Sequence, residues 1–344
     1  MINFFEQYRD SEISISDKLE ECEKYINEVI LKSNSYQECH MSFYSVAKNI
    51  RFLSSYYFKS IKNGKSPIIS ENCRPGEDSF WSSNTGKSWY PWLWGRHKSS
   101  SNNNAHVWSK FFKDFSLIEK QIPDTGVVST PDDFILYLAC LDRVFRIEDS
   151  YFNELSGKYC NFEWPNEHVV GLQIRRGEIV RSDGDIKNSW NSRSGVGHGA
   201  RPIFSIEDYM EGLKKMNVPA KYIFVSTDSS ETIDFLREKY QDFIFISANY
   251  DRSKFLRYNG SPGTVALEFD ISRNEDLIEH YTDSCILDLY LLSKCDSYVG
   301  GMTHSEYGIL GWFLQMINKR KITKYYNVEG TLDLVNGNLK MLLV

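Results

Sequence analysis

Apolar positions in the C-terminal half of the chain follow two alternating patterns. Short apolar runs predict strands at 168–174, 221–228, 242–247 and 297–301. Longer runs with helical spacing predict helices at 205–216, 230–240, 283–295 and 305–317. Ser205 and Asp208 have the spacing of a capping box at the start of one helix. Strands and helices in alternation indicate a parallel sheet that is covered on both faces.

The N-terminal half is predicted to be mainly helical. Amphipathic spacing predicts helices at 15–34, 42–62 and 131–158. We expect Ser16 to cap the first of these, and the last to divide into two helices that meet near Arg146. A short strand is predicted at 67–70.

A long irregular stretch between residues 71 and 106 is rich in Pro, Gly, Ser and Asn. It nevertheless contains four tryptophans, namely Trp81, Trp89, Trp92 and Trp94. Tryptophan side chains need burial or a ligand, so we interpret the stretch as an ordered functional loop. Two roles stay open for these rings, which are stacking on acceptor sugars and packing the loop against its domain.

Composition narrows the classes of function. The 344 residues are 41% hydrophobic and 25% charged, which is typical of one large or two medium globular domains. The net charge of −6 gives no general basic field, so nucleic acid is not an expected partner. An anionic ligand would therefore have to be held by a local cluster of cations.

Cysteines and the N-terminus bear on location. The seven cysteines form no C-x-x-C pair, so we expect reduced thiols and neither a zinc site nor a redox motif. The N-terminal residues lack the features of a signal peptide, and no apolar run approaches the roughly 18 residues of a membrane helix. We predict a cytoplasmic protein, with peripheral membrane contact left open.

The stretch GLQIRRGEIV, residues 171–180, carries the first candidate chemistry. Side chains alternate along a strand, so Gln173 and Arg175 share one side and Arg176 takes the other. We therefore expect Arg175 to meet a ligand and Arg176 to be mainly structural. A guanidinium matches phosphate oxygens and could neutralise a leaving nucleoside diphosphate in place of a metal ion. The alternative is an arginine–carboxylate brace at the end of the strand.

Other polar residues are predicted at the same edge of the sheet, where ligands of parallel sheets bind. Asp228 ends the strand of STD, and Asp288 lies on a helix that precedes a further strand. In GGMTHSE a glycine turn brings Thr303, His304 and Ser305 to a helix start, which is a natural anion site. The alternatives are capping for Asp228 and for the hydroxyls, and an exposed helical position for Asp288.

Taken together, four segments resemble one family. GLQIRRGE, FSIEDYM, VSTD and ILDLYLLSKCD are similar to motifs of fucosyltransferases that use GDP-fucose, a group that includes the nodulation-factor, core α1,6, α1,2 and protein-O-fucosyl enzymes. The likeness is clear over about 135–315 and faint over 40–130. The chain departs from the family pattern at Gln173, where the family has His, at Ser229, which replaces an acid, and at Ile179, which replaces a lysine.

The resemblance implies an α/β fold of the GT-B type, with two facing Rossmann-like domains and a cleft between them. Residues 1–162 would form an N-terminal acceptor-side domain, helical with a small sheet. Residues 163–320 would form the donor domain that binds the nucleotide sugar, and 321–344 a C-terminal tail.

The resemblance also assigns roles to residues. Arg175 would contact the β-phosphate, and Gln173 and Asp288 would contact guanine. The donor site as a whole would comprise Gln173, Arg175, Arg176, Asp228, Asp288, Thr303, His304 and Ser305. We expect the base that deprotonates the acceptor hydroxyl near the polar segment 180–200. Asp183 is the first choice, and the further candidates are Glu178, Asp185 and His198.

The resulting prediction is an inverting, metal-independent glycosyltransferase that transfers fucose from GDP-fucose to a glycan hydroxyl. Its partners would be a nucleotide-sugar donor and a glycan acceptor, with no other cofactor. Gln173 keeps open a second reading, in which the donor is another GDP- or UDP-sugar. A third is a glycan-binding protein that kept the fold and lost the chemistry.

Overall fold

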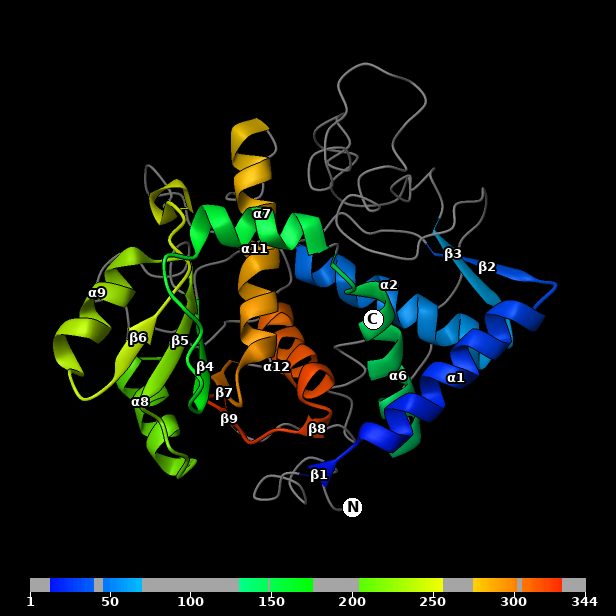
Figure 1. Cartoon of the computed structure of the whole chain (residues 1–344), viewed down its shortest axis with the longest axis horizontal. Helices are drawn as coiled ribbons and strands as arrows, with labels where there is room; N and C mark the ends of the chain where they lie inside the picture. The colour runs from blue at the N-terminus through cyan, green and yellow to red at the C-terminus, as the bar shows by residue number, and fades with distance from the viewer. Residues whose placement is uncertain are drawn as a thin grey trace, which may run out of the picture.

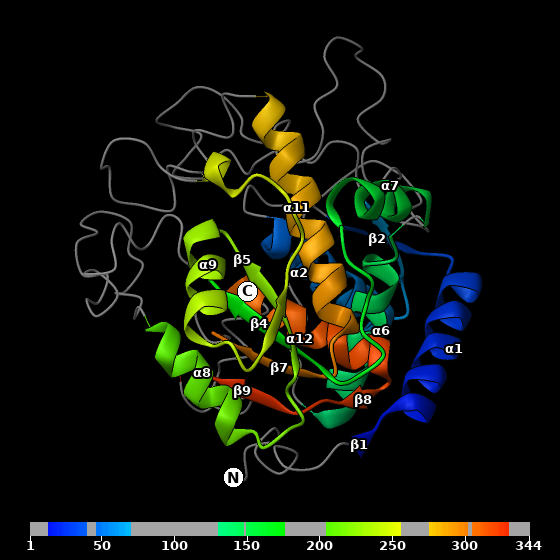
Figure 2. The ribbon, with the colours of Figure 1, turned by 60° about the vertical axis from the view of Figure 1, so that its left-hand side comes forward.

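The computed structural model describes residues 13–39, 46–69, 130–147, 149–175, 204–255, 275–301 and 305–329. These residues form an α/β fold around one five-stranded sheet (Figures 1 and 2). The predicted alternation of strands and helices is confirmed throughout the described C-terminal half. In the described part of the chain, no helix is both long enough and apolar enough to cross a membrane.

The central sheet is parallel throughout. Its strands are β4 (Val169–Ile174), β5 (Tyr222–Thr227), β6 (Ile244–Ile246), β7 (Ser297–Gly300) and β9 (Tyr325–Asn327). Their order is β6-β5-β4-β7-β9, so the chain starts in the middle, builds one side and then crosses to the other. The order reverses between β4 and β7, and this switch point is where parallel sheets open a crevice for ligands.

Helices cover both faces of the sheet (Figure 1). On one side are α8 (Ile206–Lys215) and α9 (Ser230–Lys239), and on the other are α11 (Glu275–Lys294) and α12 (Glu306–Lys319). Val170 and Leu172 of β4 pack with α8 and α9. A Cβ on Gly171 would lie 3.1 Å from Leu292 of α11, so the alternate positions of β4 face α11.

The N-terminal helices extend the α11 and α12 side. They are α1 (Ser16–Lys32), α2 (Val46–Lys62), α6 (Pro131–Val144) and α7 (Asp149–Tyr159). Phe134 of α6 meets Phe313 of α12 edge to face, with ring centroids 5.3 Å apart. One hydrophobic cluster therefore joins residues from both sides of the expected boundary at 162/163.

Two short sheets accompany this half. β2 (Tyr36–Cys39) and β3 (Ser66–Ile69) form a parallel pair, which confirms the strand predicted at 67–70. β1 (Ile13–Ser14) pairs antiparallel with β8 (Lys321–Ile322). The described residues of the expected tail are thus built into the fold, because they supply β8 and the edge strand β9.

The helix starts correct one prediction and confirm another. Ser16 is not the cap of α1, because Ile15 occupies the cap position and makes no side-chain hydrogen bond. Ser205 and Asp208 form the predicted capping box of α8, with both reciprocal hydrogen bonds present. The segment 131–158 forms two helices, α6 and α7, on either side of Arg146 as predicted.

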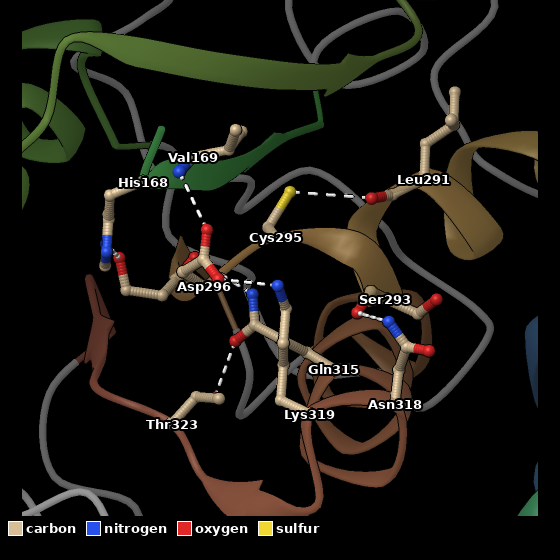
Figure 3. Close-up of polar contacts among 11 residues, drawn as sticks. His168, Val169, Leu291, Ser293, Cys295, Asp296, Gln315, Asn318, Lys319 and Thr323 are labelled. Carbon is tan, nitrogen blue, oxygen red and sulfur yellow. Dashed lines mark hydrogen bonds and ion pairs between the residues drawn. The ribbon is translucent and has the colours of Figure 1, made fainter. Parts of the chain in front are cut away.

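Polar side chains fasten the amino ends of β4 and β7 (Figure 3). The Asp296 carboxylate accepts a hydrogen bond from the Val169 amide at 2.9 Å and pairs with the Lys319 ammonium at 2.5 Å. Gln315 of α12 donates to the Ser297 carbonyl at 3.0 Å and accepts from the Thr323 hydroxyl at 2.6 Å. This network ties the amino end of the sheet to α12. The candidate site lies at the opposite, carboxyl end of the strands.

Candidate functional site at the carboxyl edge of the sheet

The site is built on the carboxyl ends of three neighbouring strands. Gln173 of β4 lies in register with Ser226 of β5 and with Gly300 of β7. Gln173 and Ser226 are 5% and 3% exposed, so polar side chains are buried where the sheet ends. The alternation along β4 places Gln173 on the α11 side of the sheet, as it does Gly171.

The first turn of α12 closes the β7 side of this site. Ser305 caps the helix by accepting a hydrogen bond from the Gly308 amide at 3.1 Å. A Cβ on Gly308 would lie 2.0 Å from the Gly301 carbonyl oxygen and 3.2 Å from the Gln173 side-chain oxygen. Only glycine lets the helix start approach this closely. The capping role that the sequence left open for Ser305 is therefore present.

Arg175, Asp228 and Asp288 each affect the ionisation of the buried Cys285 thiol. Burial raises the pKa of Cys285, the carboxylates of Asp288 and Asp228 raise it further, and the Arg175 guanidinium opposes them. These effects come from two strand ends and one helix that are far apart in the sequence. Three residues that the sequence predicted for one site thus lie within electrostatic range of the same thiol.

Asp288 is a buried acid and not the exposed helical residue that the sequence left as an alternative. It is 2% exposed, and one carboxylate oxygen accepts a hydrogen bond from the Tyr250 hydroxyl at 2.8 Å. Burial raises the pKa of Asp288 to about 6, against the opposing effects of the Arg252 guanidinium and of the hydrogen bond from Tyr250. The carboxylate therefore remains largely ionised at neutral pH and can accept hydrogen bonds.

Asp228 does not cap the helix that follows it. Ser229 occupies the cap position of α9 and accepts a hydrogen bond from the Thr232 amide at 3.2 Å. Asp228 is half-buried at the end of β5, where its carboxylate acts on Cys285. The capping alternative for Asp228 is therefore wrong.

Two residues of the site were missed by the sequence prediction. Arg252 and Tyr250 follow β6, and their side chains are 6% and 7% exposed. The Arg252 Nε donates to the Thr227 carbonyl at 2.9 Å, and its guanidinium carbon lies 4.1 Å from the centre of the Tyr250 ring. The sequence did contain a signal for them, the polar stretch NYDRS that follows the predicted strand 242–247. In a parallel sheet this strand ends at the same edge as the strand that precedes Asp228.

Several predicted residues lie outside the described part of the chain. These are Arg176, Glu178, Asp183, Asp185, His198, Thr303 and His304. The four tryptophans of the 71–106 segment also lie outside it. Their roles stay as predictions.

Comparison with known proteins gives the following findings. No family model and no curated protein matches the sequence significantly. Among solved structures, the chain is similar to a NodZ α-1,6-fucosyltransferase co-crystallised with GDP, with 12% identity, 81% of this chain and 92% of that chain covered, and a TM-score of 0.38. Fucosyltransferase NodZ from Bradyrhizobium gives 12% identity, coverage of 82% and 94%, and a TM-score of 0.38.

A variant of Arabidopsis thaliana FUT1 in complex with GDP is also similar, with 13% identity, coverage of 87% and 76%, and a TM-score of 0.42. The two NodZ structures carry the name of the family that the sequence motifs resemble.

Proposed function

We propose that the chain is an inverting, metal-independent glycosyltransferase that transfers fucose from GDP-fucose to a glycan hydroxyl. The observation that carries the proposal is the polar carboxyl edge of the sheet, where Gln173 is buried in register with Ser226 and the buried Asp288 carboxylate accepts a hydrogen bond from Tyr250. A cation beside the switch point and a buried acceptor behind it are what a nucleoside diphosphate requires.

Arg175 neutralises the leaving diphosphate in this proposal. Negative charge grows on the diphosphate as the bond to the sugar breaks, so a fixed guanidinium stabilises the transition state more than the ground state. Arg175 is half-buried at the end of β4, where a bound phosphate would be partly shielded from water. It takes the role that a divalent cation has in other sugar transferases.

Asp288 and Gln173 hold the base of the nucleotide. The Asp288 carboxylate accepts the N–H groups of guanine, which adenine does not present in the same order. Its burial supports this role, because a fixed and desolvated acceptor discriminates strongly against a ligand that leaves it unpaired. Gln173 lies in register beside Ser226 and supplies further hydrogen-bonding groups.

The acceptor binds on the side of the N-terminal half, across a cleft of the GT-B type. In this assignment 1–162 serves the acceptor and 163–320 the donor. Asp183 deprotonates the acceptor hydroxyl, with Glu178 as the second candidate. The hydroxyl then attacks the anomeric carbon from the face opposite the diphosphate, and the configuration inverts.

A donor screen tests the proposal. The protein is incubated with GDP-fucose, GDP-mannose and UDP-glucose, and released nucleotide and melting temperature are both followed. We expect GDP at about 100 times its Kd to stabilise the fold by about 2.7 kcal/mol, and GDP-fucose to be consumed when a glycan acceptor is present. Indifference to every nucleotide would contradict the proposal.

One observation favours a second donor. Gln173 replaces the histidine of the motif, so part of the base or sugar recognition differs from the family pattern. Consumption of another GDP-sugar in the same screen would keep the reaction and change the sugar. Preference for UDP over GDP would move the assignment of Asp288 away from guanine.

A further inference from the structure

Two buried charged groups at the carboxyl edge each retain an atom without a hydrogen-bond partner among the described residues. They are Nη2 of Arg252 and Oδ1 of Asp288. The two residues are 6% and 2% exposed. Buried polar atoms of folded proteins are nearly always hydrogen-bonded, so each exception needs an explanation. A missing ligand explains both at once.

One tyrosine holds the two groups in place. The Tyr250 hydroxyl donates to Oδ2 of Asp288 at 2.8 Å, and the Arg252 guanidinium stacks over the Tyr250 ring at 4.1 Å. The Nε of Arg252 is anchored to the Thr227 carbonyl at 2.9 Å. The guanidinium also lowers the pKa of Asp288, which means that the two charges are near each other. The carboxylate and the guanidinium are therefore preorganised as a pair.

Such a pair matches guanine better than other bases. Guanine presents its N2–H and N1–H donors beside its O6 acceptor along one edge. A carboxylate accepts from the two donors, and a guanidinium donates to the acceptor. Adenine presents a donor where guanine has O6, and uracil has a single donor between two acceptors. The order of charges at Asp288 and Arg252 thus selects a 6-oxopurine with a 2-amino group.

We propose that Arg252 is a specificity-determining residue that donates from Nη2 to O6 of the guanine base held by Asp288. This inference rests on the proposed function, which places the guanine at Asp288. It adds a residue from the segment after β6 that no motif of the chain marks. The Gln173 side-chain oxygen faces the first turn of α12.

Titration calorimetry with nucleotide analogues tests the contact. The wild-type protein is titrated with GDP, 6-thio-GDP, inosine diphosphate and ADP. A charge-assisted hydrogen bond is lost or weakened with the sulfur analogue, so we expect it to bind about 10-fold more weakly than GDP. Inosine diphosphate lacks the 2-amino group and reports on Asp288, with an expected loss of about 10- to 100-fold.

The variant Arg252→Met separates the inference from general damage. We expect it to bind GDP about 10- to 100-fold more weakly and to lose the preference for GDP over 6-thio-GDP. Arg237→Met is the matched control, because Arg237 is exposed on α9, and we expect wild-type affinity. Thermal melting checks that each variant is folded.

The outcomes distinguish this inference from the proposed function. If wild-type protein binds GDP but does not discriminate against 6-thio-GDP, or if folded Arg252→Met keeps full affinity, the role of Arg252 is wrong and the proposed function stands. If wild-type protein does not bind GDP, the proposed function fails and this inference fails with it. Should Arg252→Met not fold, the wild-type comparison of the two analogues decides alone.

Discussion

The two ends of the central sheet differ in how completely their buried polar groups are hydrogen-bonded. At the amino end, both carboxylate oxygens of Asp296 and both the nitrogen and the oxygen of the Gln315 side-chain amide have protein partners (Figure 3). At the carboxyl end, Asp288 and Arg252 each keep an atom that no described residue satisfies. The polar groups at the amino end hold elements together, and we propose that those at the carboxyl end bind a ligand. Substitutions at the amino end should therefore lower the stability of the fold, and substitutions at the carboxyl end should lower activity or nucleotide binding.

The largest effect is expected for Arg175→Ala. Removal of a fixed charge that stabilises a transition state typically lowers kcat by about 100- to 1,000-fold. We expect that loss in the rate of fucose transfer, with a melting temperature close to wild type because Arg175 is only half-buried. Arg175→Lys keeps the charge without the planar fork and should fall between the two. Wild-type turnover of the alanine variant would remove Arg175 from the mechanism.

The next largest effect is on the free energy of unfolding, and it is expected for a substitution at the amino end of the sheet. Asp296→Ala leaves the Val169 amide and the Lys319 ammonium without their acceptor, so we expect unfolding to become easier by about 2–3 kcal/mol. Nucleotide affinity should not change while the protein is folded. Chemical denaturation measures the first and calorimetry the second.

A surface ion pair supplies the control for that substitution. Lys32 and Glu28 lie one turn apart on α1 with exposed side chains, and Lys32→Ala should cost less than about 0.5 kcal/mol. An equal cost for Asp296→Ala and Lys32→Ala would mean that the amino end is not fastened as described.

The last effect has the opposite sign and depends on pH. Burial raises the pKa of Asp288 from its ordinary 3.8 to about 6, so the folded protein holds this proton more tightly than the unfolded chain. The resulting stability is fully present below about pH 4 and is lost as the pH rises through 6. At pH 8 the charged carboxylate thus opposes folding, and Asp288→Asn should stabilise the protein by roughly 1–3 kcal/mol.

Melting of wild type and Asp288→Asn between pH 4 and pH 8 measures this difference. We expect the two curves to approach each other at low pH and the variant to be the more stable one at high pH. The same variant should bind GDP poorly. A variant that is less stable at pH 8 would show that the Asp288 carboxylate holds the fold together and is not kept for a ligand.

Local patterns were sufficient to predict most elements of the sheet. The runs that became β4, β5 and β7 are apolar on both faces, and the helices between them have clear apolar stripes. β9 was missed because an edge strand of three residues has too little pattern to distinguish it from a tail. Ser16 was misassigned because the hydroxyl next to a helix start need not occupy its cap position.

The site was only partly predictable for a related reason. Asp228 and Asp288 could be placed because each belongs to a recognisable strand or helix. The role of Arg252 depends on β6 lying beside β5, and on the Tyr250 ring that fixes the guanidinium, and neither is encoded in the local sequence. Side-chain pairing across elements follows from the sheet order, which a single sequence does not state.

A crystal structure with bound GDP tests the central claim most directly. The account predicts the diphosphate within hydrogen-bonding distance of the Arg175 guanidinium, and the guanine edge between Asp288 and Arg252. A nucleotide bound elsewhere, with Asp288 and Arg252 still facing each other in a closed interior, would contradict it.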